Sequence, residues 1–266
     1  MADGGLIEIN GTVLRYRRFG EGRTLLVLLH EMGGTLESWD AVVPLLRENC
    51  RILTHDLRGF GQSEKIRGEI TFSDLTADTA ALIERVWPGE RVWVAGCAVG
   101  GAVALDLAAS RSDLVAGAVA FAPATGVAET RREAVLERVA TLEHDGLRAF
   151  FPRLEERQFP TRFRDDPARA EQFRLRRLSC DPQSYAAVWR AMAFSDLEER
   201  LDRISVPVTI VAGSEDSGRP ADQLRVLAQR IRNCRFEVID SGHAMPMITP
   251  LAVARVIRAA ISRNSL

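Results

Sequence analysis

The amino-acid sequence predicts an α/β protein, with a mostly parallel sheet of eight strands covered by helices on both faces and a helical cap inserted after the sixth strand. Short apolar segments of strand length alternate with amphipathic segments of helix length, which is the pattern of parallel strands joined by crossover helices. Several apolar segments are continuous, as strands buried on both faces are. Between residues 127 and 203 this alternation stops and only helical patterns remain.

The first two predicted strands differ from the others. Leu6–Ile9 and Val13–Tyr16 flank Asn10-Gly11, a dipeptide strongly favoured in hairpin turns, so these strands are expected to be antiparallel. Leu25–His30 is a continuous apolar run and is predicted to be a strand buried on both faces. The remaining strands are predicted at Arg51–Asp56, Val92–Gly96, Val115–Phe121, Val206–Ala212 and Arg235–Ile239.

The predicted helices fall into two groups. Those of the core are expected at Ser38–Arg47, Thr71–Val86, Val99–Ala109, Pro220–Ile231 and Leu251–Ile261. Those of the insertion are expected at Thr130–His144, Leu147–Phe151, Pro167–Cys180 and Ser184–Met192. We therefore divide the chain into a core domain, residues 1–126 and 204–266, and a cap, residues 127–203. An insertion at this point is expected to lie over the carboxyl ends of the strands, where open α/β sheets bind ligands.

Composition and charge exclude several classes of protein. The 266 residues are 46% hydrophobic and 27% charged, with a net charge of −1, which gives no electrostatic basis for binding nucleic acid or an anionic membrane. The first seven residues lack the pattern of a secretory signal, and Val92–Leu105 is too short to span a bilayer. The cysteines are too widely spaced for a disulfide framework or a zinc site. We expect a cytoplasmic protein, monomeric or homodimeric, without metal or organic cofactor.

The segment Gly96-Cys97-Ala98-Val99-Gly100 follows a predicted strand and opens a predicted helix, which is the context of the G-x-S-x-G nucleophile elbow. The apex of such a turn is strained, and a side chain at either flanking glycine would collide with backbone. Ala98 stands at the apex, where a nucleophilic serine is expected. The plain alternative is a strand-to-helix turn whose glycines serve packing. A catalytic Cys97 is disfavoured, because that register would place Val99 where a small residue is needed.

Two explanations of Ala98 remain open. The chain is either a serine-to-alanine variant of an active parent enzyme or a natural protein that lost, or never needed, the hydroxyl. We favour the variant, because the other parts of the site are present. The codon at position 98 of the encoding gene would separate the two.

A base and an acid for this site follow later in the chain. His243 lies in Ser241-Gly242-His243-Ala244, just after the last predicted strand, and is a candidate general base. Asp216 follows the preceding strand and is the candidate carboxylate that orients His243, with Glu215 as the alternative. The alternative is that these two acids form an acidic turn without a catalytic role. The order nucleophile, acid, histidine is the one that the elbow motif requires.

The loop His30-Glu31-Met32-Gly33-Gly34 is the candidate source of oxyanion donors. One backbone N–H is expected from Val99, directly after the apex, and the other from Met32. We assign His30 a structural role within the loop.

With these motifs the chain resembles the α/β-hydrolase superfamily, and within it the 3-oxoadipate enol-lactonase-like branch. The resemblance extends over nearly the whole length and includes Trp39, the segment Asp56-Leu57-Arg58-Gly59-Phe60-Gly61-Gln62-Ser63 and Asp181-Pro182-Gln183-Ser184-Tyr185 of the cap. It implies the fold strongly and the substrate weakly, because such relatives cleave esters, lactones, amides and carbon–carbon bonds. Two positions depart from the pattern. Ala98 replaces the serine, and Glu31 stands where many relatives carry a small residue.

The substrate pocket is expected under the cap. We take Phe151, Trp189 and Met192, together with Phe150, as candidates to contact substrate, against the alternative that they only pack the cap on the core. Glu31 is a further candidate, because it adjoins the oxyanion loop. The cap arginines are interpreted mainly as a solvated, paired surface, since acidic residues are about as numerous there. They include Arg131, Arg153, Arg157, Arg174 and Arg177.

The sequence therefore predicts a serine-hydrolase scaffold for a small-molecule carbonyl substrate, a carboxylic ester or lactone cleaved through an acyl-enzyme. Two other functions remain open. One is a ligand-binding protein or receptor that has abandoned catalysis. The other is a cofactor-free oxygenase or carbon–carbon bond hydrolase in which His243 and Asp216 act as the base.

Overall fold

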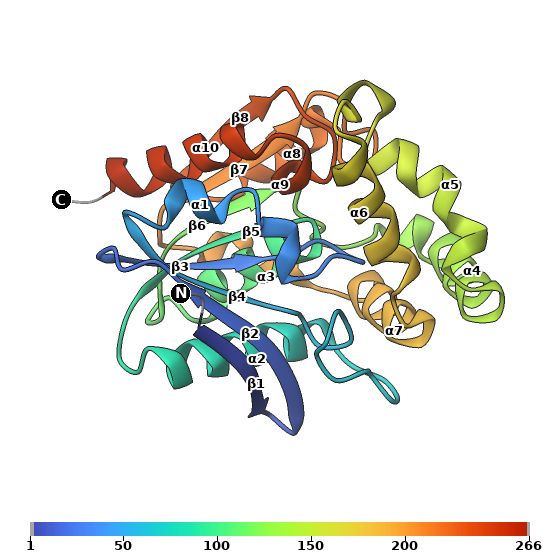
Figure 1. Cartoon of the computed structure of the whole chain (residues 1–266), viewed down its shortest axis with the longest axis horizontal. Helices are drawn as coiled ribbons and strands as arrows, with labels where there is room; N and C mark the ends of the chain where they lie inside the picture. Colours follow the sequence, from blue (N-terminus) through green and yellow to red (C-terminus); the bar gives the residue numbers. More distant parts are fainter. Residues whose placement is uncertain (1–2, 265–266) are drawn as a thin grey trace.

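A computed structural model describes residues 3–264, with the exception of the side chains of residues 152 and 153, and is shown in Figure 1. One eight-stranded sheet has the order β1-β2-β4-β3-β5-β6-β7-β8. β1 and β2 pair antiparallel and the other neighbours pair in parallel, apart from the β2–β4 pair. The strands are β1 Asp3–Ile9, β2 Thr12–Phe19, β3 Thr24–Leu29, β4 Cys50–His55, β5 Val92–Cys97, β6 Val115–Phe121, β7 Val208–Gly213 and β8 Cys234–Ile239. The predicted mostly parallel sheet is confirmed.

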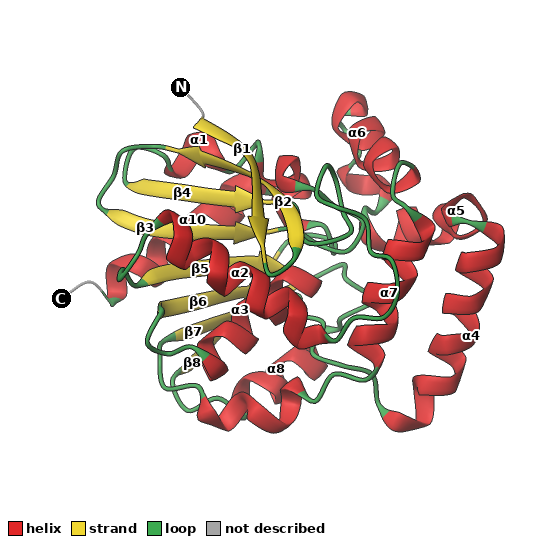
Figure 2. Ribbon diagram, turned by 90° about the horizontal axis from the view of Figure 1, so that it is seen from below, coloured by secondary structure: helices red, strands yellow, loops and turns green. Residues whose placement is uncertain are grey.

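Helices cover both faces of this sheet, as Figure 2 shows. α2, α3 and α8 lie on one face, and α1 and α10 pack together on the other. The helices of the core are α1 Val43–Leu46, α2 Phe72–Val86, α3 Val99–Ser110, α8 Ala221–Gln229, α9 Met245–Ile248 and α10 Pro250–Arg263, with a 3₁₀ helix η1 Leu36–Trp39. The cover on both faces explains why the central strands are continuous apolar runs.

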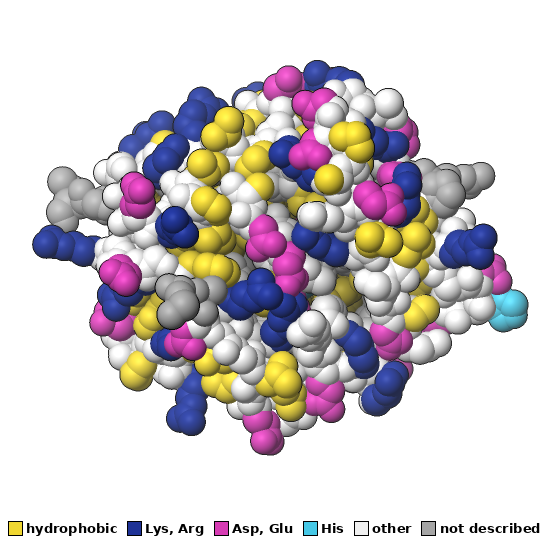
Figure 3. Space-filling view, viewed as in Figure 1, with side chains coloured by type: hydrophobic (Ala, Val, Ile, Leu, Met, Phe, Trp, Pro, Cys, Tyr) yellow, Lys and Arg dark blue, Asp and Glu magenta, His cyan; other side chains and the backbone are white. Residues whose placement is uncertain are grey.

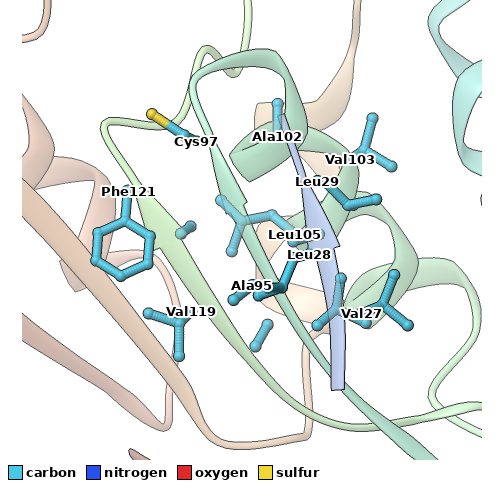
Figure 4. Packing of buried hydrophobic residues seen from close by; sticks show 14 of the residues in the cluster. Val27, Leu28, Leu29, Ala95, Cys97, Ala102, Val103, Leu105, Val119 and Phe121 are labelled. Atoms are coloured by element: carbon cyan, nitrogen blue, oxygen red, sulfur yellow. The ribbon is translucent and has the colours of Figure 1, made fainter. Parts of the chain in front are cut away.

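Side chains from three strands and one helix meet in the middle of the core (Figure 4). Val27 and Leu28 of β3, Ala95 of β5, Val119 of β6 and Leu105 of α3 are all fully buried. Fully burying a side chain of this size contributes about 1.5–3 kcal/mol. This packing makes the sheet a rigid platform for the loops at its carboxyl edge.

The expected helix Ser38–Arg47 is wrong. The structure has η1 and the single turn α1 instead, with Pro44 in the first turn of α1. Proline has no N–H to donate and its ring clashes with the preceding turn, so one continuous helix from Ser38 to Arg47 cannot form, whereas Pro44 is tolerated in the first turn of α1.

The segment between β6 and β7 holds only helices, which lie beyond one end of the sheet (Figure 1). They are α4 Glu129–Asp145, α5 Leu147–Gln158, η2 Thr161–Phe163, α6 Pro167–Leu178, α7 Pro182–Ala193 and η3 Leu197–Arg203. α4 packs on α7 and α5 on α6. The backbone N–H of Ile66 in the core donates to the Ser184 hydroxyl of α7 at 3.0 Å. We call residues 127–203 the cap.

The face shown in Figure 3 carries arginine and acidic side chains interspersed with each other, without a large area of one sign. In the part of the chain that the structure describes, no helix combines the length and apolarity needed to cross a membrane.

The turn between β5 and α3 holds its backbone in a strained conformation. Ala98 has φ 51° and ψ −111°, in the region that non-glycine residues rarely adopt. A Cβ at Gly96 would lie 2.1 Å from the carbonyl oxygen of Gly100, and a Cβ at Gly100 would lie 2.4 Å from that of Leu29. These contacts are with backbone, which cannot move aside. The turn therefore requires glycine on both sides of Ala98.

We expect Gly96→Ala to lower the free energy of unfolding by about 3 kcal/mol, because the added methyl group overlaps backbone. Gly5→Ala in β1 is the matched control, since nothing lies within 4 Å of its Cβ position, and it should change stability by no more than about 0.5 kcal/mol. Urea unfolding of both variants measures the difference. Equal stabilities would show that the elbow tolerates a side chain.

Candidate active site

Four loops meet at the carboxyl edge of the sheet. The loop after β3 carries Met32, the turn after β5 carries Ala98, the loop after β7 carries Asp216 and the loop after β8 carries His243. Because parallel strands end at the same edge, segments far apart in the sequence converge there. The cap lies over this edge (Figure 2).

Asp216, which is buried, pairs with His243, which is partly exposed to the cavity. Nδ1 of His243 lies 2.6 Å from Oδ2 of Asp216, and Asp216 is only 3% exposed. The other oxygen, Oδ1, accepts from the backbone N–H groups of Gly218 at 2.9 Å and Arg219 at 3.1 Å. Burial alone raises the pKa of Asp216, but the attraction of His243 and these hydrogen bonds outweigh it, so the pKa is lowered. The carboxylate therefore stays ionised and holds the imidazole.

Of the two acids in this loop, the structure brings only Asp216 to His243. Glu215 is exposed and its carboxylate lies 3.3 Å from the guanidinium of Arg162 in the cap.

Both ring nitrogens of His30 are bound to backbone groups, so His30 has no free nitrogen for proton transfer to a substrate. Nε2 of His30 accepts from the backbone N–H of Leu57 at 2.9 Å, and Nδ1 contacts the carbonyl of Glu31 at 2.8 Å. Because Nε2 accepts, Nδ1 carries the proton and donates to Glu31. This arrangement orients the loop that carries Met32.

Two backbone N–H groups adjoin Ala98. Val99 is the first residue of α3, and the N–H groups of a first helical turn have no acceptor within their own helix. No backbone carbonyl in the described part of the chain accepts from the N–H of Met32. Both residues line the same cavity as Ala98 and His243. The site therefore has two candidate donors for a developing oxyanion.

The cavity has a volume of about 640 Å³ and lies between the carboxyl edge of the sheet and the cap. Such a volume fits a small organic ligand. Trp189 and Met192 of α7 and Phe150 of α5 line it. The other lining residues are Met32, Ala98, Val99, Ala124, Arg138, Ala149, Leu154, Arg157, Gln158, Tyr185, Gly218, Arg219 and His243.

Phe151, expected to contact substrate, does not line this cavity. It is 5% exposed and packs in a separate apolar cluster with Phe159 and Phe173. Consecutive residues of a helix point about 100° apart. The face of α5 that carries Ala149 and Phe150 is turned to the cavity, and Phe151 is turned to the separate cluster.

Glu31 does not line the cavity either. Its carboxylate is 1% exposed and lies 3.0 Å from the guanidinium of Arg177, which is 2% exposed. Burial alone raises the pKa of Glu31, but the charge and hydrogen bond of Arg177, together with His30 and a backbone hydrogen bond, outweigh it, so the pKa is lowered. The structure therefore pairs Glu31 with the cap and not with the cavity.

Cys97 is enclosed beneath the apex, where its Sγ donates to the carbonyl of His243 at 3.3 Å. Burial, and next the charge of Glu31, keep the pKa of this thiol well above its ordinary range. A thiol held in this form is a poor nucleophile.

Several cavity residues had no specific signal in the sequence. Arg157 was one of many cap arginines, and Arg219 gave no motif although it stands three residues after Asp216. Tyr185 belongs to a cap segment of the family resemblance, and burial raises the pKa of its hydroxyl, which stays a neutral donor. Arg153 lies outside the described side chains. Among the described residues, no group of three or more His, Cys, Asp or Glu side chains could hold a metal ion.

Comparisons with known proteins agree with this geometry. The family model described as "Serine aminopeptidase, S33" matches residues 20–244. The chain is 30% identical over 243 residues to 3-oxoadipate enol-lactonase 1 of Acinetobacter baylyi, covering 89% of this chain and 85% of that protein.

Two solved structures superimpose over nearly the full length. The enol-lactonase from Burkholderia xenovorans LB400 has a TM-score of 0.89 and 25% identity, covering 97% of this chain and 100% of that one. A thermophilic esterase from Thermogutta terrifontis has a TM-score of 0.90 and 25% identity, covering 99% and 100%. The chain belongs to the α/β-hydrolase family that the serine aminopeptidase S33 model describes, and its relatives include lactone and ester hydrolases.

Proposed function

We propose that this chain is the scaffold of an ester or lactone hydrolase that works through an acyl-enzyme, with residue 98 as the nucleophile position. One observation carries the proposal: the Asp216–His243 pair opens onto the same cavity as the strained residue 98 and the N–H groups of Met32 and Val99. Each of these groups has a defined role in acyl transfer, as nucleophile position, base, orienting acid or oxyanion donor.

The reaction follows from these positions once a serine stands at 98. Its hydroxyl attacks the substrate carbonyl while Nε2 of His243 takes the proton, and Asp216 holds the Nδ1–H and stabilises the imidazolium. The N–H groups of Met32 and Val99 bind the oxyanion. His243 then protonates the leaving group, and water, activated by the same imidazole, releases the acid. With Ala98 the first bond cannot form, so we expect the chain to bind substrate with little turnover.

We expect Ala98→Ser to raise the hydrolysis of short nitrophenyl esters or small lactones by about 10³-fold or more, because the oxygen enters a site already arranged for it. A substrate panel with stopped-flow detection of an acyl-enzyme burst measures this. The control is Ala98→Ser with His243→Gln, which should return to the rate of the Ala98 chain.

A folded Ala98→Ser protein without activity on any of these compounds would contradict the proposal. If the Ala98 chain nevertheless bound the same compounds in calorimetric titration, the second candidate, a ligand-binding protein, would be favoured. The methyl group at position 98 is the observation that supports that candidate.

We propose further that the substrate carries an anionic group. Arg157 and Arg219 line the cavity, the guanidinium of Arg157 lies against Gly218, and neither arginine forms an ion pair within the described residues. Burial lowers the pKa of Arg219; Asp216 opposes this and Arg157 adds to it. Arg138 is a third arginine of the lining, which contains no acid. Positive charges gathered beside each other without a partner favour binding of a carboxylate.

In the Ala98→Ser background, Arg219→Gln should raise KM for a carboxylate-bearing lactone by about tenfold, because a charged hydrogen bond is lost. KM for a neutral lactone of similar size should change less than about twofold. Arg148→Gln on the exposed side of α5, outside the cavity, is the control and should leave both values unchanged. Equal changes in KM for the two substrates would contradict the proposal that the substrate carries an anionic group.

Alanine substitutions of Trp189 and Phe151 should have different effects, the first on substrate preference and the second on stability. Trp189→Ala enlarges the cavity, so the ratio of kcat/KM between long-acyl and short-acyl esters should rise about fivefold with little change in Tm. Phe151→Ala opens a hole in the separate apolar cluster and should cost about 3–5 kcal/mol of stability without changing that ratio. Thermal unfolding and competition kinetics measure both, and a reversed pattern would exchange the two assignments.

A further inference from the structure

The buried ion pair Glu31–Arg177 joins two parts of the molecule that are 146 positions apart in the sequence. Glu31 belongs to the loop after β3 and directly precedes Met32. Arg177 belongs to α6 of the cap. Both side chains are enclosed, at 1% and 2% exposure. A charge pair without water around it resists separation, because either partner alone would be a buried uncompensated charge.

The loop leaves room for this pair. A Cβ at Gly34 would lie 2.7 Å from Oε1 of Glu31, and a Cβ at Gly33 would lie 3.2 Å from Cγ of Arg177. The Glu31 carboxylate also accepts from the Ser38 hydroxyl at 3.2 Å. The two glycines therefore serve the ion pair as well as the turn.

Arg177 is also linked to the loop that carries His243. Its Nε donates to Oε1 of Gln158 at 2.9 Å. The backbone carbonyl of Gln158 accepts from the N–H of Ala244 at 3.0 Å, and Ala244 directly follows His243. The guanidinium of Arg177 thus contacts Glu31 directly and is linked to Ala244 through Gln158. Glu31 precedes Met32, and Ala244 follows His243.

The guanidinium is held flat in one orientation. Its carbon lies 3.4 Å from the centre of the Phe173 ring, and Phe173 is fully buried. A planar fork fixed by stacking sets the direction of each of its hydrogen bonds, which an ammonium group on a flexible stem does not.

We propose that Arg177 is a positioning residue, through which the cap holds the oxyanion loop and the His243 loop in register. The positioning follows from contacts in the chain as it stands; only its catalytic consequence rests on the proposed hydrolase function. Without Arg177 the Glu31 carboxylate is a buried charge beside the oxyanion site, where it opposes the developing negative charge and draws the loop toward solvent. Arg177 therefore neutralises Glu31 and aligns Met32 in the same contact.

The first test needs no activity. Amide hydrogen exchange is measured on the Ala98 chain and on its Arg177→Gln variant. We expect exchange to accelerate at least tenfold in residues 30–34 and at Ala244, with the β5 and β6 amides unchanged. Arg174→Gln is the matched control: Arg174 lies on the same helix, is 43% exposed and pairs with the exposed Glu171 and the largely buried Glu155 of the cap, not with either loop. It should leave both loops unchanged.

The second test uses the Ala98→Ser background. Arg177→Gln should lower kcat at least tenfold with KM changed less than threefold, and Arg177→Lys should recover only part of the loss, because it restores the charge without the fork. Glu31→Gln combined with Arg177→Gln should lose no more activity than Arg177→Gln alone, as for residues acting as a unit.

The outcomes separate the two claims. If Ala98→Ser is inactive, the proposed hydrolase function is contradicted. The hydrogen-exchange experiment still tests whether Arg177 positions the two loops, because it needs no activity. Unchanged exchange in both loops of a folded Arg177→Gln or Arg177→Lys protein overturns the positioning role. Equal losses of activity and Tm for Arg174→Gln and Arg177→Gln also overturn it, because they assign Arg177 to general cap stability.

Discussion

The close approach of backbone segments at the turn after β5 is the constraint on which the rest of the site depends. Gly96 lies against Gly100, and Gly100 lies against the carbonyl groups of Leu29 and His30. This contact brings the apex at residue 98 and the loop after β3 to one place, so that the N–H groups of Val99 and Met32 share a cavity. A side chain at either glycine would separate them.

The same constraint holds Ala98 at a positive φ. A non-glycine residue in such a region costs about 1–3 kcal/mol, and the surrounding packing must supply it. In a serine hydrolase this strain presents the hydroxyl to substrate. Here the strain remains without the hydroxyl, and the Asp216–His243 pair is also intact. The strained turn and the Asp216–His243 pair that the proposed acyl-transfer mechanism uses are thus both present, although residue 98 is alanine.

The arginines of the cap have different surroundings. Arg174 pairs with the largely buried Glu155, and Arg190 pairs with the half-buried Glu143, both within the cap. Arg177 is buried and joins the cap to the core. Arg157 faces the cavity without a carboxylate among the described residues. Arginines with three kinds of surroundings thus occur on three neighbouring cap helices, α5, α6 and α7, and only the surroundings distinguish them.

The sequence by itself determined what depends on local pattern and on chain order. Continuous apolar runs identified the strands, because burial on both faces leaves no polar face to alternate with. Glycines around Ala98, together with Asp216 and His243 after later strands, predicted a candidate site, since parallel strands end at one edge. The predicted helix Ser38–Arg47 was wrong, because Pro44 lacks the N–H that a continuous helix through this segment requires.

The tertiary structure decided what depends on contacts between distant segments. Phe150 and not Phe151 reaches the cavity, because the rotation of α5 about its axis is set by packing against α6. Asp216 and not Glu215 meets His243, because the loop after β7 turns one side chain inward. Glu31 meets Arg177 only when the cap folds over the oxyanion loop, and no local pattern connects residues separated by 146 positions. Local patterns fix which elements form, whereas the pairing of side chains across elements is fixed only by how those elements pack.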